Sequence, residues 1–264
     1  MLILQVMIPF AVQAEDRAKI FEGMLNKNNS IAIKLENEKY WYRFENTSWE
    51  VLKSGIMEGG GAKEVIFLDV NKNHINDIFV KLFEVGANSI YALFIASEKD
   101  GAIIFSEYDE LFGSPHIDDR GQLVSIKRDG PFSIMEFYMA ENGRLYRNKI
   151  SEPISSELEK VTSFRRSGEK EYAVNFLGTD IPATACVYAD RAYLSKSPSA
   201  ADVTKSYIIK GDGVSIIDSA VNGEWLKIRY HGRRIIDGWL PQAMLSLREA
   251  GDCMRDDSSL GELN

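Results

Sequence analysis

The chain has 264 residues, a hydrophobic fraction of 45%, a charged fraction of 27% and a formal net charge of −8 at pH 7. These values are typical of an ordinary globular protein that is long enough to bury a sizeable core, most simply in two domains. The acidic balance argues against a nucleic-acid partner, because phosphate neutralisation needs a basic surface, and it is compatible with a cationic protein partner.

The first residues, MLILQVMIPFAVQAED, have the pattern of a secretory signal peptide. An apolar run from Leu2 to Val12 precedes small residues at the positions that a signal peptidase reads, which predicts a signal peptide over residues 1–14. No Lys or Arg precedes the run, so either the true start lies upstream or the run is an amphipathic first element. No segment reaches the roughly 20 apolar residues of a membrane-spanning helix. We therefore expect a periplasmic or secreted protein without a membrane span.

Residues 15–176 carry mainly β patterns, with alternating or β-branched runs separated by turn residues such as Asp100-Gly101 and Asn142-Gly143. Helical patterns are expected only at Asp16–Asn26 and Asp109–Phe112, and a connector opens over Glu152–Leu158. Many strands and few helices predict an all-β fold that begins with an antiparallel sheet domain. The predicted strands are Ser30–Leu35, Lys39–Phe44, Trp49–Leu52, Glu64–Leu68, Ile78–Val85, Ser89–Ala96, Ala102–Phe105, Leu123–Arg128, Phe132–Met139, Arg144–Lys149 and Lys170–Phe176.

The loop DVNKNHIND places oxygen-bearing groups at alternate positions, which is the pattern of many calcium sites. A calcium ion there would use the side chains of Asp69, Asn71, Asn73 and Asp77 and the carbonyl of Ile75, with water completing its shell. Such an ion would be structural, since it would hold a loop between two strands. The alternative is an Asx-rich turn whose side chains bond their own backbone.

Two positions distinguish this loop from familiar calcium loops. Val80 occupies the twelfth position, where an EF-hand needs a bidentate Glu. His74 stands where such loops use Gly for a sharp turn, so we expect His74 to adopt a positive φ at some cost in energy.

The sequence contains no catalytic motif that we can identify. It has three histidines, of which His116 lies nearest to carboxylates, and it has no H-E-x-x-H, G-x-S-x-G or P-loop pattern. Glu107 and Asp109 have the residue types of a glycosidase pair, but 39 acidic residues make such coincidences common. We therefore expect a binding protein rather than an enzyme.

A second unit is predicted over residues 183–247, where Ser, Pro, Gly and Asp separate short strands that would close into a small barrel. The two cysteines of the chain, Cys186 in this unit and Cys253 beyond it, would form a disulfide in an oxidising compartment and hold down the tail of residues 248–264. The alternative is two buried thiols, because spacing alone does not show that the Cα atoms approach. The predicted strands are Ala185–Ala189, Ser206–Ile209, Val214–Ser219, Glu224–Tyr230 and Arg233–Leu240.

This second unit resembles bacterial SH3 domains through the runs YLS, YIIKGD, NGEWLKIRY and GWL, which occur in that order. The resemblance implies an SH3-like β-barrel of a family that often binds peptidoglycan or peptides in exported bacterial proteins. Gly211 and Gly223 would supply turn conformations. Trp225 and Trp239 are expected to fill the small core rather than to stack on a ligand.

Residues 31–149 resemble the FG-GAP/VCBS-like domains of exported bacterial proteins. The resemblance rests on the serial order of the strand VIFL, the loop at Asp69, the strand YALF, the segment FSEYDEL and the hairpin ENGRL. It implies a propeller-like antiparallel sheet domain. Asn73 and His74 depart from the family pattern, in which an acid and a glycine are usual. Characterised relatives include inhibitors of lysozyme-like enzymes and immunity proteins that protect the periplasm against wall-degrading toxins.

These resemblances imply an exported immunity or inhibitor protein that neutralises a peptidoglycan-degrading toxin or a lysozyme-like enzyme. Acidic side chains would then face the cationic cleft of the target. The alternatives are a peptidoglycan-binding wall module without an inhibitor role, and a hydrolase whose site is not evident. The segment Ser163–Tyr172 is expected to be a charged β-hairpin, or alternatively a loop that enters an enzyme cleft. The candidate partner-binding residues are Glu107, Asp109, Glu110, Asp118 and Asp119.

Overall fold

The computed structural model describes residues 18–54, 64–220, 223–248 and 253. The predicted all-β fold with antiparallel sheets is confirmed: the described elements are strands in four sheets and two short 3-10 helices, η1 (Ala200–Asp202) and η2 (Gln242–Met244). Among these residues, no helix has the length and apolarity needed to cross a membrane. The predicted signal peptide and the tail beyond residue 248, except Cys253, lie outside the described residues.

The described residues form two compact units. The first contains residues up to 69, 73–84 and 91–110, and the second contains 70–72, 85–90 and the residues from 111 onward.

The first sheet has the order β1-β2-β3-β4, with β1 (Lys19–Met24), β2 (Ser30–Glu36), β3 (Lys39–Phe44) and β4 (Glu50–Ser54). Alternation along the strands explains their positions: Ile31, Ile33 and Tyr40 point into the core. The turn between β2 and β3 has positive φ at both Asn37 and Glu38, which matches the twist of a two-residue hairpin.

The second sheet has the order β5-β6-β7-β8. Its strands are β5 (Val65–Leu68), β6 (Asp77–Val85), β7 (Asn88–Lys99) and β8 (Ala102–Gly113). Apolar residues of β6 and β7 share one buried cluster with the first sheet, and this cluster is the core of the first unit. The buried members from these two strands are Ile78, Val80, Leu82, Ala92, Phe94 and Ala96.

Two helix predictions are wrong. The described part of Asp16–Asn26 contains strand β1, although Phe21 and Leu25 have helical spacing. A helix would bury Ile20 and Met24 beside them, whereas the structure leaves both about half exposed. At Gly23 a Cβ would lie 2.5 Å from the Phe67 ring, so the strand depends on this glycine for close packing. The second predicted helix, Asp109–Phe112, is the end of strand β8.

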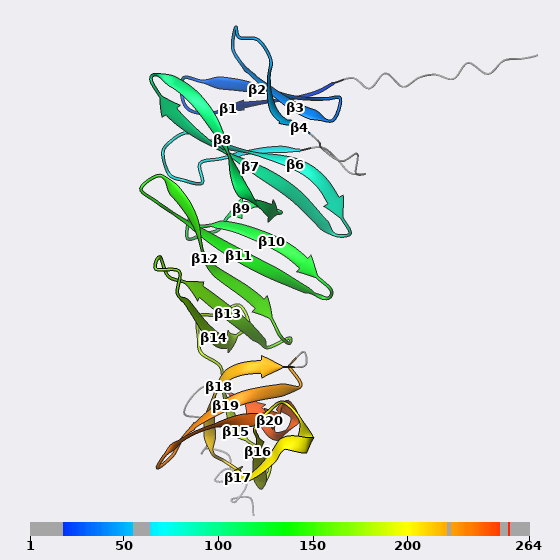
Figure 1. Ribbon diagram of the computed structural model, residues 1–264, viewed down its shortest axis with the longest axis vertical. Helices are drawn as coiled ribbons and strands as arrows, with labels where there is room; N and C mark the ends of the chain where they lie inside the picture. The colour runs from blue at the N-terminus through cyan, green and yellow to red at the C-terminus, as the bar shows by residue number, and fades with distance from the viewer. Residues whose placement is uncertain (1–17, 55–63, 221–222, 249–252, 254–264) are drawn as a thin grey trace, which may run out of the picture. The chain divides into compact units, whose positions relative to one another are not determined.

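The third sheet belongs to the second unit and has the order β14-β13-β12-β11-β10-β9; Figure 1 shows β10, β11 and β12 side by side. The strands of the third sheet are β9 (His116–Ile117), β10 (Leu123–Asp129), β11 (Phe132–Glu141), β12 (Arg144–Pro153), β13 (Leu158–Phe164) and β14 (Lys170–Phe176). The strand β13 was not predicted, and it pairs with β14 in the charged hairpin expected at Ser163–Tyr172.

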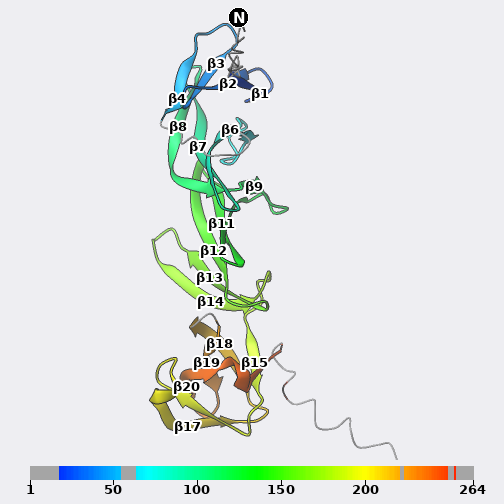
Figure 2. The same ribbon diagram turned by 90° about the vertical axis from the view of Figure 1, so that its right-hand side faces the viewer.

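The fourth sheet curls into a half-barrel with the order β17-β16-β20-β19-β18-β15-β21, seen from two directions in Figures 1 and 2. Gly211 and Gly223 have φ near +88° and +87°, as expected for its turns. Its strands are β15 (Thr184–Val187), β16 (Arg191–Ser195), β17 (Val203–Ile209), β18 (Gly213–Ala220), β19 (Trp225–His231), β20 (Ile235–Pro241) and β21 (Leu245–Leu247).

The prediction that two tryptophans fill this core is wrong. Leu226, Ile228 and Leu240 are fully buried, while Trp225 and Trp239 alternate with them and are half-buried on the opposite face of the sheet. Aliphatic side chains therefore fill the concave side of the half-barrel.

The core of the second unit extends beyond the fourth sheet. Leu158 of β13 and Val174 of β14 belong to the same buried cluster as Leu226, Ile228 and Leu240. Lys160 and Asp218 form an ion pair at 3.1 Å between β13 and β18. One continuous core thus includes residues on both sides of 176–183. The predicted domain boundary there stays a prediction.

Candidate functional site

The loop at Asp69 is held by the hydrogen bonds of an Asx-rich turn. The two carboxylate oxygens of Asp69 accept from the main-chain N–H groups of Asn73 (3.1 Å) and His74 (2.9 Å). The Asn73 Oδ1 accepts from the Ile75 N–H at 2.9 Å. His74 has φ of 67°, as expected for the residue at the glycine position.

The same loop is fixed to strand β7. The Asn73 Nδ2 donates to the Ala96 carbonyl, and the Asp77 Oδ1 accepts from the Ala96 N–H, both at 2.8 Å. Asp77 is completely buried, and Asn71 is also buried. These contacts position the loop through its own side chains, which is the alternative to calcium that the sequence left open.

The predicted calcium ligands have the chemistry that Ca²⁺ prefers, because all of them are oxygen donors. Each carboxylate oxygen that accepts one N–H retains another lone pair, so the hydrogen bonds and an ion are compatible. Among the described residues, no group of three or more His, Cys, Asp or Glu side chains is placed to hold a metal. The loop contributes two acids, and its remaining donors are amide and carbonyl oxygens. Calcium binding at the loop stays a prediction.

Three of the predicted partner-binding residues lie on strand β8, at the edge of the second sheet. Glu107 and Asp109 are exposed and leave the same side of the strand, since one residue separates them. Glu110 leaves the other side and is half-buried. Lys53 forms an ion pair with Glu107. The structure thus brings Glu107 and Asp109 together on an accessible edge.

The other two predicted partner-binding residues, Asp118 and Asp119, belong to the second unit. The Asp118 carboxylate holds its own turn, because its Oδ1 accepts from the N–H groups of Arg120 (3.0 Å) and Gln122 (2.8 Å). Asp119 is exposed. His116, the histidine nearest to these acids in sequence, is exposed in β9, and its Nδ1 lies 3.4 Å from the Ser114 carbonyl oxygen.

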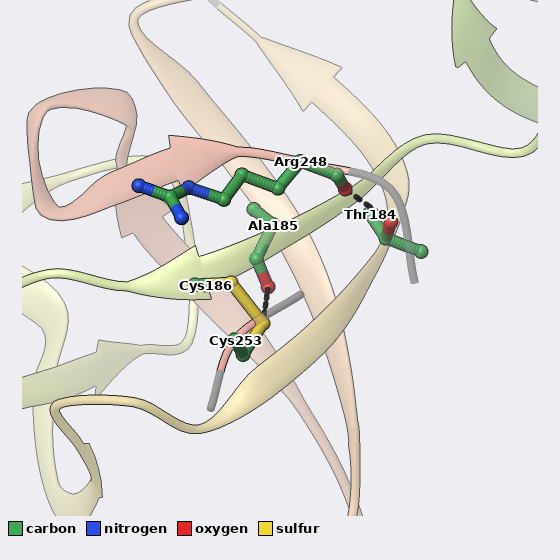
Figure 3. The surroundings of a disulfide bond; sticks show 5 residues. All are labelled: Thr184, Ala185, Cys186, Arg248 and Cys253. Atoms are coloured by element: carbon green, nitrogen blue, oxygen red, sulfur yellow. Dashed lines mark hydrogen bonds between the residues drawn. A yellow bond between two sulfur atoms is a disulfide. The ribbon is translucent and has the colours of Figure 1, made fainter. Parts of the chain in front are cut away.

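A disulfide joins Cys186 in β15 to Cys253, with the two Cα atoms 5.3 Å apart (Figure 3). This is the first of the two alternatives that the sequence left open. Beside it, the Thr184 hydroxyl donates to the Arg248 carbonyl at 2.5 Å, and the Arg248 N–H donates back to the Thr184 carbonyl at 3.2 Å. The chain that follows β21 is therefore attached to β15 twice, by hydrogen bonds at Arg248 and by the disulfide at Cys253.

Sequence reasoning missed two buried carboxylates of the third sheet, Glu136 and Glu159, which are 7% and 4% exposed. Glu136 was detectable, because it is the single charged residue of the apolar run SIMEFYM. Its Oε2 accepts from Lys127 Nζ at 2.6 Å, and its Oε1 accepts from Arg147 Nη1 at 2.8 Å. Glu159 was not detectable, because it lies in β13, whose sequence LEKVTSF contains several polar residues and was not predicted as a strand.

A pocket of about 250 Å³ opens beside Glu159 in the second unit. Asp180 lies at its rim, where Arg120 donates to one carboxylate oxygen at 3.1 Å and Lys149 lies 3.5 Å from the other. The hydrogen bond from Arg120, together with the charge of Lys149, holds the pKa of Asp180 below its usual value. Asp118 and Asp119 line the same pocket, so the sequence identified part of its rim but not its floor.

Comparisons of this chain with protein-family models, with curated proteins and with solved structures found no match.

Proposed function

We propose that the chain is an exported inhibitor or immunity protein that binds a peptidoglycan-degrading toxin or a lysozyme-like enzyme. The observation that carries this proposal is the exposed pair of carboxylates, Glu107 and Asp109, on the edge strand β8. An edge strand presents unpaired main-chain groups to a partner, and the carboxylates add attraction to a cationic cleft.

The proposal includes the two finer fold assignments. Residues 15–176 are proposed to be of FG-GAP/VCBS-like type, and residues 183–247 are proposed to be a bacterial SH3-like barrel. The curled antiparallel fourth sheet supports the second assignment, and the antiparallel pairing of the earlier sheets is compatible with the first. The disulfide supports export to the periplasm or beyond, since disulfides persist in oxidising compartments.

The test is inhibition of a panel of purified muramidases, amidases and peptidoglycan peptidases acting on isolated sacculi. We expect one class of enzyme to be inhibited. The double substitution Glu107→Gln and Asp109→Asn should slow association with that enzyme about tenfold or more at low salt, because steering charges act mainly on the association rate. The matched control removes two exposed acids from loops of the second unit, with Asp190→Asn before β16 and Glu224→Gln before β19.

The control should associate like the wild type. Absence of inhibition across the panel would contradict the proposal, and so would an equal loss in both double variants.

A wall-binding module is the second candidate, and the exposed face of the fourth sheet favours it. The Tyr193 and Tyr207 rings, 42% and 46% exposed as residues, lie 5.6 Å apart, and Arg191 lies 5.2 Å from the centre of the Tyr207 ring. Paired aromatic rings beside a cation suit a sugar bearing carboxylates. Co-sedimentation with sacculi, lost in the Tyr193→Ala and Tyr207→Ala variant while enzyme inhibition persists, would assign this role to the fourth sheet.

A further inference from the structure

The pocket beside Glu159 is built on one face of the third sheet. Its walls come from alternate residues of three neighbouring strands, which therefore point to the same side: Met135 and Phe137 of β11, Lys149 and Ser151 of β12, and Glu159 of β13. The turn at residues 118–120 and the loop at residues 178–180 form its rim. Two apolar side chains, Met135 and Phe137, thus line the same pocket as the buried Glu159 carboxylate.

The Glu159 carboxylate lacks a cationic partner among the described residues. Its Oε2 accepts from the Ser151 hydroxyl at 2.6 Å, and its Oε1 has no donor in the described part of the chain. Glu136, in the same sheet and similarly buried, is bound by Lys127, Arg147 and the hydroxyl of Ser125. A buried carboxylate is costly unless it is paired. Glu159 therefore differs from a structural ion pair.

The two cations at the pocket are both committed to Asp180. Arg120 and Lys149 contact its two carboxylate oxygens, as described above. Lys149 Nζ also lies 4.2 Å from the centre of the Phe137 ring, so an ammonium group already contacts the aromatic wall. The pocket is lined by four carboxylates, those of Asp118, Asp119, Asp180 and Glu159, and by only these two cations, so it attracts positive charge.

We propose that this pocket binds an alkylammonium group, which would pair with the free oxygen of Glu159 and lie against Met135 and Phe137. A small free amine and a lysine side chain of a protein partner offer the same chemistry. Where the lysine belongs to the enzyme target, the inference rests on the proposed function, because that target is the partner which would supply the side chain. The pocket itself requires no enzyme and is testable alone.

The test is a titration of the isotope-labelled full chain, followed by amide chemical shifts, with two cationic probes. One is n-butylammonium, which represents a free amine, and the other is Nα-acetyl-lysine N-methylamide, which represents a protein side chain. The uncharged Nε-acetylated form of the second probe is the negative control. We expect saturable shifts at residues 149–151, 159 and 178–180 with the cations only. Preference between the two cations identifies the source.

Three variants make the result decisive. Glu159→Gln should weaken the binding about tenfold or more, because it removes a charge-assisted hydrogen bond. Glu152→Gln removes the same charge from an exposed site on β12 and should bind like the wild type. Lys149→Met removes the competing ammonium from Phe137 and should bind more tightly, which misfolding would not produce.

Unchanged binding by Glu159→Gln would overturn the proposal, as would shifts outside the pocket or no saturation of the wild type. None of these results affects the inhibition assay, which depends on β8. Loss of inhibition with normal ammonium binding would instead contradict the proposed function and leave this pocket assigned.

Discussion

The two buried glutamates of the third sheet should lose very different amounts of stability on the same substitution. In Glu136→Gln, the amide retains the size of the side chain but loses the charge that binds Lys127 at 2.6 Å and Arg147 at 2.8 Å. Each charge-assisted hydrogen bond contributes about 1.5–3 kcal/mol, but the two cations remain about one-third exposed and regain water. We therefore expect a loss of about 3 kcal/mol in the free energy of unfolding.

Glu159→Gln is the matched perturbation. It removes a carboxylate of similar burial that has one hydroxyl donor and no cation among the described residues. We expect its cost to stay below about 1 kcal/mol, because a neutral amide is easier to bury than an unpaired charge.

The assay is urea unfolding of the full chain at pH 7, monitored by tryptophan fluorescence and far-ultraviolet circular dichroism. A true stability change moves the midpoint without changing the dependence on urea. Equal losses in the two variants, or a larger loss in Glu159→Gln, would refute the distinction between a structural and a ligand-binding carboxylate.

Four further predictions are simpler. Reduction of the disulfide, or replacement of Cys186 and Cys253 by serine, should lower the unfolding free energy by about 4 kcal/mol, because the bond closes a loop with a sequence separation of 67 residues. Denaturant unfolding with and without reductant measures this loss, and equal midpoints would contradict it. Tyr40→Phe should cost about 1.5 kcal/mol in thermal or urea unfolding, since it leaves a buried main-chain carbonyl without the hydroxyl that binds it at 2.8 Å; a neutral effect would mean that water replaces the hydroxyl. Because the folded pKa of Asp180 is lowered, its carboxylate stabilises the fold above the unfolded pKa, and this contribution is lost as the pH falls through the folded pKa. Asp180→Asn should therefore flatten the pH dependence of the unfolding free energy below about pH 4. Parallel pH profiles for the wild type and the variant would count against the pairing. Millimolar Ca²⁺ should raise the melting temperature if the loop of residues 69–77 binds the ion, and an unchanged melting temperature would remove the calcium prediction.

The sequence predicted most strands of this chain because alternation and turn chemistry agreed. Asn142 and Gly143, for example, have positive φ in a two-residue turn between β11 and β12. Strand β13 was missed because Glu159 and Lys160 interrupt its apolar pattern. The burial of Glu159 is evident only in the folded structure. The helix predicted around Phe21 failed because pairing with β2 outweighs helical spacing in a short segment.

The candidate site was predictable only in part. Asp118 and Asp119 were identified as acidic surface residues, and their turn forms the pocket rim. The floor of the pocket combines residues of three strands, and its chemistry depends on which carboxylates lack cations. Pairing of this kind is a property of the folded sheet, since Arg147 and Lys149 are close in sequence yet contact different acids.

The covalent link between Cys186 and Cys253 also determines how the chain would transmit mechanical load. Tension applied through segments on either side of these two residues would pass along the sulfur–sulfur bond and bypass strands β16 to β21. At about 3.5 Å per extended residue, the 67-residue separation means that roughly 230 Å of chain would not be extended in a pulling experiment while the bond is intact. Those strands would withstand stretching until the bond was reduced, whatever force their hydrogen bonds could resist alone.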